Sequence, residues 1–119
     1  MDGLAHAVVA TDPVARADVV DLLRQRDVFV VTTLSAMASM FGMPVAEPLV
    51  TSSIGARIGP RCRDYLRRLA GPAPRWAQWD AVLAFVSEAS ECGVRLLAGT
   101  DAAFPGVVPG PPCTVSWSC

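Results

Sequence analysis

The chain has 119 residues, of which 52% are hydrophobic, and a formal net charge of −1 at pH 7. This length corresponds to one domain or to part of one. The near-neutral charge provides no general attraction to nucleic acid or to a membrane surface. No apolar run reaches the roughly 18 residues that a membrane-spanning helix needs, and no basic leader precedes the first apolar residues. We therefore expect a cytoplasmic protein with no nucleic-acid or membrane partner.

The first third of the chain predicts a strand, a helix and a second strand. Residues 4–9 (LAHAVV) are typical of a short buried strand and include His6, the sole histidine. Asp12 and Pro13 then resemble the start of a helix, and apolar residues recur at helical spacing over 14–26. Residues 28–32 (VFVVT) are β-branched and aromatic without alternation, as in a parallel strand buried on both faces.

The remaining chain predicts helices and a third strand. A short helix fits 34–41, a loop fits 42–60, and a second amphipathic helix fits 61–70. Residues 75–92 carry the longest helical pattern, with an expected apolar stripe of Trp76, Trp79, Val82, Leu83 and Val86. Residues 94–98 complete the pattern as a buried strand. Alternating strands and helices predict the α/β class, with about three parallel strands and flanking helices.

Polar side chains stand at the predicted ends of these strands. Thr32 and Thr33 follow the second strand, Thr100 and Asp101 follow the third, and His6 lies within or near the end of the first. Chemistry in parallel α/β folds is concentrated at this edge of the sheet. Each residue also has an ordinary structural interpretation, because His6 could be a satisfied core residue and Asp101 could cap a turn.

Three segments together resemble a known family. DGLAH at 2–6, VFVVTTLS at 28–35 and GVRLLAGTDAAFPG at 93–106 are similar to the last three strands of the metal-dependent amidohydrolase superfamily. The resemblance implies a partial (β/α)8 TIM-type barrel. It also implies that Asp101 is catalytic and a metal ligand, and that the metal is a divalent cation such as zinc. By the same resemblance His6 is a metal ligand, or bonds the reacting oxygen as in single-metal members. The reaction implied is hydrolysis of a carbon–nitrogen bond in a small-molecule amide by metal-activated water.

The chain departs from the family in its ligand set. Members draw further ligands from a His-x-His pair, from a carboxylated lysine or a glutamate, and from another histidine, whereas this chain has one histidine and no lysine. We therefore expect residues 1–110 to be the C-terminal part of an amidohydrolase-related domain, inactive in isolation. The alternative is a catalytically inactive α/β fragment, or a subunit that pairs with a separate N-terminal half. Exposed barrel faces predict self-association in either case.

Residues 111–119 do not continue the expected pattern. The sequence CTVSWSC stands where a helix should begin, and a one-base shift of G/C-rich codons would give Leu-His-Gly-Glu-Leu-Glu-Leu. We expect this tail to be a frameshift product, which TCN codons at Ser116 and Ser118 would contradict. The four cysteines, two of them in this tail, follow no zinc-binding spacing.

A basic cluster lies in the predicted helix 61–70 and just before it. Its members are Arg57, Arg61, Arg63, Arg67 and Arg68. A nucleic-acid surface and a solvated helix face both fit this cluster, and an expected pair between Asp64 and Arg68 favours the solvated face.

Overall fold

The computed structural model of the chain describes residues 2–44, 46–68 and 73–101. These ranges contain all three segments of the family resemblance except the last few residues of the third. The end of the predicted 1–110 domain and the whole tail 111–119 lie outside the described residues, so the frameshift remains a prediction.

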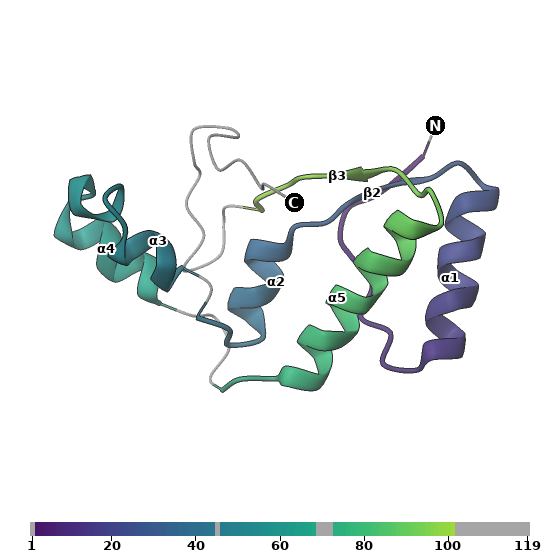
Figure 1. The fold of residues 1–119 in the computed structure, drawn as a ribbon, viewed down its shortest axis with the longest axis horizontal. Coiled ribbons are helices and arrows are strands. Elements are labelled where there is room, and N and C mark those ends of the chain that lie inside the picture. The colour runs from purple at the N-terminus through teal and green to yellow at the C-terminus, as the bar shows by residue number, and fades with distance from the viewer. Residues whose placement is uncertain (1, 45, 69–72, 102–119) are drawn as a thin grey trace.

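The centre of the fold is a small parallel sheet (Figure 1). Its strands are β1 (Gly3–Leu4), β2 (Phe29–Val31) and β3 (Leu96–Leu97), and they are arranged in chain order. Backbone hydrogen bonds of 2.9 Å join the Val30 nitrogen to the Arg95 oxygen and the Thr32 nitrogen to the Leu97 oxygen. The predicted α/β class with three parallel strands is confirmed.

The first strand is shorter than the sequence predicts. Residues 4–9 were expected to be extended throughout, but β1 ends at Leu4, and His6 lies two residues beyond it. The apolar character of the run has another cause, because Ala7 is buried and Val8 packs against the hydrophobic core without joining the sheet. A short apolar run indicates burial more reliably than it indicates strand.

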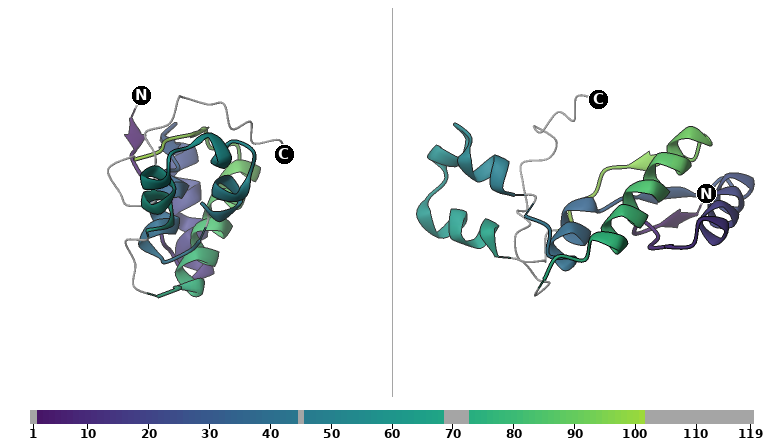
Figure 2. Two further views of the ribbon diagram at one scale, coloured as in Figure 1. Left: turned by 90° about the vertical axis from the view of Figure 1, so that its left-hand side faces the viewer. Right: turned by 60° about the horizontal axis from the view of Figure 1, so that its bottom comes forward.

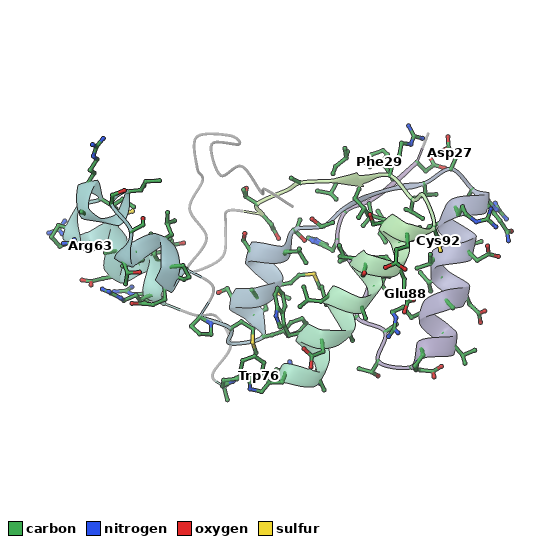
Figure 3. All side chains as sticks on the ribbon, in the orientation of Figure 1. Asp27, Phe29, Arg63, Trp76, Glu88 and Cys92 are labelled. Atoms are coloured by element: carbon green, nitrogen blue, oxygen red, sulfur yellow. The ribbon has the colours of Figure 1, made fainter. Side chains whose placement is uncertain are left out.

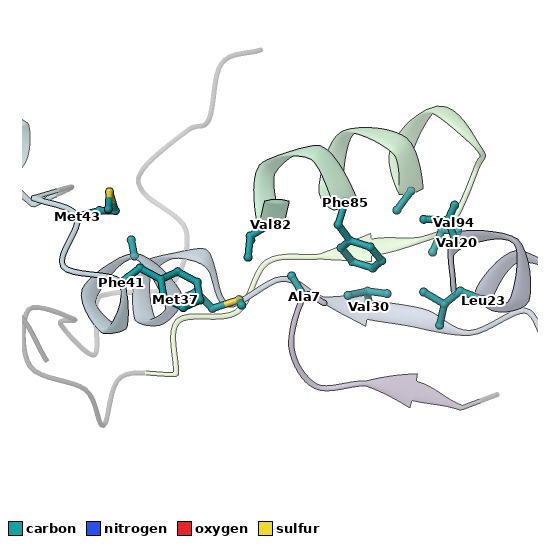
Figure 4. Packing of buried hydrophobic residues seen from close by; sticks show 12 residues of the cluster. Ala7, Val20, Leu23, Val30, Met37, Phe41, Met43, Val82, Phe85 and Val94 are labelled. Atoms are coloured by element: carbon teal, nitrogen blue, oxygen red, sulfur yellow. The ribbon is translucent and has the colours of Figure 1, made fainter. Parts of the chain in front are cut away.

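Three helices lie on the same side of the sheet: α1 (Pro13–Gln25), α2 (Leu34–Met40) and α5 (Trp76–Glu91) (Figure 1). Helix α1 begins as expected, because the Asp12 carboxylate accepts a hydrogen bond of 3.0 Å from the Ala15 nitrogen. The core lies between sheet and helices, where Val30 and Phe85 are both 0% exposed (Figure 4).

The expected apolar stripe of α5 is only partly correct. The buried line runs through Val82, Phe85 and Ala89, with Trp79 and Val86 partly buried beside it. Trp76 and Leu83 are exposed. Residues at spacings of three and four share one face of a helix, and the sheet contacts the face centred on Phe85.

The region 42–60 is not a continuous loop, contrary to expectation. It contains helix α3 (Glu47–Thr51) and a 3₁₀ helix, η1 (Gly55–Arg57), and helix α4 (Pro60–Arg67) follows. Prolines suggested irregular chain, but Pro48 and Pro60 each lie in the first turn of a helix, where no amide hydrogen bond is lost. We call residues 46–68 the helical arm, which lies to one side of the sheet and its helices (Figure 2).

Within residues 2–44, 46–68 and 73–101, no helix combines the length and apolar character needed to cross a bilayer.

Candidate functional site

The carboxyl ends of the three strands define the candidate site. Because β1, β2 and β3 are parallel neighbours, the residues that follow them lie along one edge of the sheet. His6 follows β1, Thr33 follows β2, and Asp101 follows β3. The shortened first strand moves His6 from the interior of a strand to this edge, which is where the family resemblance requires it.

A hydrogen bond joins the first two of these residues. The distance between His6 Nδ1 and Thr33 Oγ1 is 2.9 Å. Thr33 is buried, with 4% of its surface exposed, whereas His6 is exposed. The buried hydroxyl therefore contacts one ring nitrogen, and the rest of the imidazole faces outward.

Thr33 has an unusual backbone conformation. Its φ is +45°, in the left-handed region that β-branched residues rarely adopt. It is also the N-cap residue of α2, yet its side chain makes no capping hydrogen bond to that helix. The hydroxyl is directed instead to His6, across 27 positions of sequence.

Gly99, just beyond β3, packs closely against the same threonine. A Cβ atom built at Gly99 would lie 3.3 Å from Thr33 Cγ2 and 2.4 Å from Val31 Cγ1. A glycine is therefore required here, because any larger residue would displace these side chains. The hydroxyl of Thr33 bonds to the end of β1 while its methyl group approaches the end of β3.

Asp101 is half-buried and also has a left-handed backbone, with φ of +46°. Asp27 is the remaining non-glycine residue with positive φ among the described residues, and its carboxylate pairs with Arg95 at 2.7 Å. Among the described residues, the Asp101 carboxylate makes no hydrogen bond or ion pair. Strained backbone is concentrated at functional sites, and two of the three strained residues lie at this edge.

The residues of the edge suit a metal by type but not by number. Imidazole nitrogen and carboxylate oxygen are both zinc ligands, and a catalytic zinc site uses three protein ligands. Among the described residues, no group of three or more histidine, cysteine, aspartate or glutamate side chains is placed to hold a metal ion. His6 and Asp101 therefore do not make a complete metal centre by themselves.

A cavity of about 280 Å³ between α1 and α5 lies away from this edge. Its acidic lining is largely neutralised, because Glu88 bonds Arg16 at 2.7 Å and Asp21 bonds Arg24 at the same distance. The Arg16 hydrogen bond lowers the pKa of Glu88. Figure 3 shows Glu88 between the two helices. These pairs join covering helices or stabilise their surface, and Glu91 is the lining carboxylate without an arginine partner among the described residues.

The basic cluster lies on the helical arm, to one side of the sheet and its covering helices, as Arg63 shows in Figure 3. Arg67 pairs with Glu47 of α3 at 3.3 Å. The expected pair between Asp64 and Arg68 is absent from the described residues, so that prediction is wrong. Four of the five arginines are exposed and Arg63 is half-buried, and the solvated helix face remains the prediction for this surface.

Comparison of the chain with protein-family models, with curated proteins and with solved structures finds no match. The case for a function therefore depends on the residues at the sheet edge. Sequence reasoning placed Thr33 at this edge but gave it no role. A threonine between a buried strand and a helix was the available signal, and it does not reveal a bond to a residue 27 positions away.

Proposed function

We propose that this chain contributes the last three β/α units of an amidohydrolase-like barrel, with His6 and Asp101 as two ligands of a divalent cation, zinc by donor type. The activity proposed is hydrolysis of a carbon–nitrogen bond in a small-molecule amide. The observation that carries the proposal is the placement of an imidazole and a carboxylate after the outer strands of one parallel sheet.

The arrangement of the layers supports a barrel. The strands follow one another in chain order, and α1, α2 and α5 lie on one side of the sheet. In doubly wound folds the helices cover both faces, whereas in a (β/α)8 barrel they cover only the outer face. The inner face would then be completed by further strands.

The surroundings of Asp101 suit a proton carrier. The carboxylate is half-buried and has no competing partner among the described residues. When water adds to the amide carbonyl carbon, Asp101 would accept a proton from that water and return it to the leaving nitrogen as the C–N bond breaks. His6 would offer its exposed ring nitrogen. A bound divalent cation supplies polarisation of the carbonyl and acidification of water.

The missing donors define the form in which the activity can exist. The chain has one histidine and no lysine, so it lacks the further ligands of the family, and no group of three possible zinc ligands is placed together among the described residues. We therefore propose that the site is completed by residues of another polypeptide segment, and that the 119 residues alone bind zinc weakly and have no turnover.

Zinc titration followed by calorimetry tests this proposal. We expect His6→Ala and Asp101→Asn each to weaken zinc binding at least about tenfold, since each would remove one ligand. Asp27→Asn is the matched control, because Asp27 shares the left-handed backbone but pairs with Arg95. Equal zinc affinity in all four proteins would refute the assignment. Stoichiometric tight zinc with amidase turnover would refute the need for a second segment.

The second candidate function is a non-catalytic subunit that associates through its uncovered sheet face. Leu97 on β3 is 50% exposed and pairs with the half-buried Val31, while Phe29 is half-buried beside Gly3. Apolar side chains on an uncovered sheet favour association with another protein surface or a second copy. This candidate predicts association without zinc binding.

A further inference from the structure

We infer that Thr33 is a positioning residue for His6: it engages Nδ1, and thereby makes Nε2 the ring nitrogen that meets a ligand. The identity of that ligand rests on the proposed function, but the role of Thr33 does not. Nδ1 lies 2.9 Å from a hydroxyl that is buried, and the imidazole is otherwise exposed. Nε2 is the ring nitrogen left without a hydrogen bond within the described residues.

The conformation of Thr33 argues that this contact serves a purpose other than stability. The residue adopts a left-handed backbone that glycine or asparagine would adopt with less strain. Its hydroxyl also forgoes the usual N-cap bond to α2. Two unfavourable local features are thus kept together with one distant hydrogen bond, as is common where a functional side chain is held in place.

The methyl group of Thr33 lies on the side of Gly99. The absence of a side chain at Gly99 lets the methyl group approach β3, with 3.3 Å between Thr33 Cγ2 and the position a Cβ would take. The threonine therefore connects the end of β1 to the end of β3, the two ends that carry His6 and Asp101.

The chemical consequence is a choice between two ring nitrogens. A histidine that binds a cation through Nε2 carries its proton on Nδ1 and donates it to an oxygen acceptor, which fixes the ring. Thr33 Oγ1 is such an acceptor, and a hydroxyl can also donate to Nδ1 when that nitrogen is unprotonated. Nε2 has a free lone pair only in the first state, because a hydroxyl that donates to Nδ1 leaves the ring proton on Nε2. The positioning role inferred for Thr33 is therefore that of acceptor from Nδ1–H.

Alkylation of the sole histidine tests this directly without any metal. Bromoacetate gives Nδ1- and Nε2-carboxymethylhistidine, which are separated and quantified after hydrolysis of the protein. We expect the native chain to give mainly the Nε2 product. In Thr33→Val, which keeps the shape and loses the hydroxyl, the ratio of Nδ1 to Nε2 product should rise about fivefold, the factor for one ordinary hydrogen bond. Thr33→Ser should restore the native ratio.

Thr32→Val is the matched control, because Thr32 is the neighbouring threonine and its hydroxyl lies 3.4 Å from the Leu97 oxygen, away from His6. Its ratio should equal that of the native chain. If Thr33→Val does not fold, the native sequence is alkylated in denaturing urea instead. Its ratio of Nδ1 to Nε2 product should then exceed that of the folded native chain. Equal ratios in native and denatured chain, or in native chain and folded Thr33→Val, would overturn the inference.

A separate measurement distinguishes this failure from failure of the proposed function. The ¹⁵N shift of Nε2 on addition of zinc chloride reports metal binding, whereas the alkylation ratio reports the Thr33 contact. If zinc chloride does not change the ¹⁵N shift of Nε2 and the alkylation ratio rises in Thr33→Val as expected, the metal proposal is refuted and the role of Thr33 stands. A zinc-dependent shift with an unchanged ratio in Thr33→Val would do the reverse.

Discussion

The two faces of the sheet differ in what covers them. On one face Val30 contacts a core that includes Phe85 and Leu23, and α1, α2 and α5 seal it from solvent (Figure 4). Phe29, Val31 and Leu97 lie on the other face. The Phe29 ring lies beside Gly3, and the Val31 side chain lies beside Gly99. Adjacent residues of one strand thus meet opposite environments, because side chains alternate across a sheet.

This difference shows where the stability of the described residues originates. The covered face has the fully buried Val30, Val82 and Phe85, a capped helix and an ion pair between its covering helices. The open face carries the half-buried Phe29 and Val31 and the exposed Leu97, and none of the described helices covers it. We therefore expect substitutions on the covered face to change the free energy of unfolding, and those on the open face to change association.

The largest effect is expected for Phe85→Ala. Truncating a fully buried phenylalanine removes its transfer free energy and leaves a cavity, so the free energy of unfolding should fall by about 3–5 kcal/mol. Urea denaturation measures this. Leu83→Ala, on the exposed side of the same helix, is the control and should cost less than about 1 kcal/mol. Similar losses for the two variants would contradict the assignment of faces.

A smaller, pH-dependent effect is expected from Glu88. The Arg16 hydrogen bond lowers the pKa of Glu88 in the folded chain, so the pair stabilises the fold above the ordinary glutamate pKa. This contribution is lost as the pH falls through the lowered value. The native chain should be more stable than Glu88→Gln at pH 7, and the difference should shrink steadily below about pH 4.

Urea titrations of both proteins between neutral and acidic pH measure that difference. Glu91→Gln is the control on the same helix, since the Glu91 carboxylate accepts a bond from Ser87 and no arginine pairs with it among the described residues. A gap between native chain and Glu88→Gln that does not change with pH would show that the ion pair does not join α1 to α5.

The smallest effect on unfolding is expected on the open face. Leu97→Thr preserves strand propensity and removes half-exposed apolar area, so the free energy of unfolding should change by less than about 1 kcal/mol. Self-association, followed by sedimentation velocity over a concentration series, should weaken several-fold. Val14→Thr, an exposed apolar residue of α1, is the control. Undiminished association in Leu97→Thr would exclude the sheet face as the interface.

Local signals in the sequence were sufficient for the class of the fold. Unalternating β-branched runs predicted parallel strands, and Asp12 with Pro13 predicted the start of α1. The expected burial of the strands on both faces is wrong for the described residues, because Leu97 is 50% exposed and Phe29 and Val31 are only half-buried. Signals that depend on tertiary contacts failed. The apolar run 4–9 reflects burial of its side chains and not a strand of that length. The buried face of α5 could not be assigned without knowing where the sheet contacts the helix. Proline-rich chain concealed α3, because proline is compatible with a first helical turn.

The candidate site was predictable only as separate residues. Asp101 could be placed after a strand from the apolar run that precedes it, whereas His6 was expected within or near the end of the strand 4–9, and only the shorter β1 places it beyond the strand end. Their common edge follows from the strand order, which the sheet confirms. The bond from Thr33 to His6 could not be predicted, since it depends on a left-handed backbone at a β-branched residue, a conformation that no local sequence preference favours.

The left-handed threonine has an evolutionary consequence. At this position glycine or asparagine would relieve the backbone strain. A threonine is therefore advantageous while a histidine at residue 6 forms the hydrogen bond with its hydroxyl. Drift at residue 33 is therefore tied to drift at residue 6. In diverged copies of this gene the two positions should covary, with a hydroxyl residue kept beside an imidazole and a less strained residue taking over once the imidazole is gone.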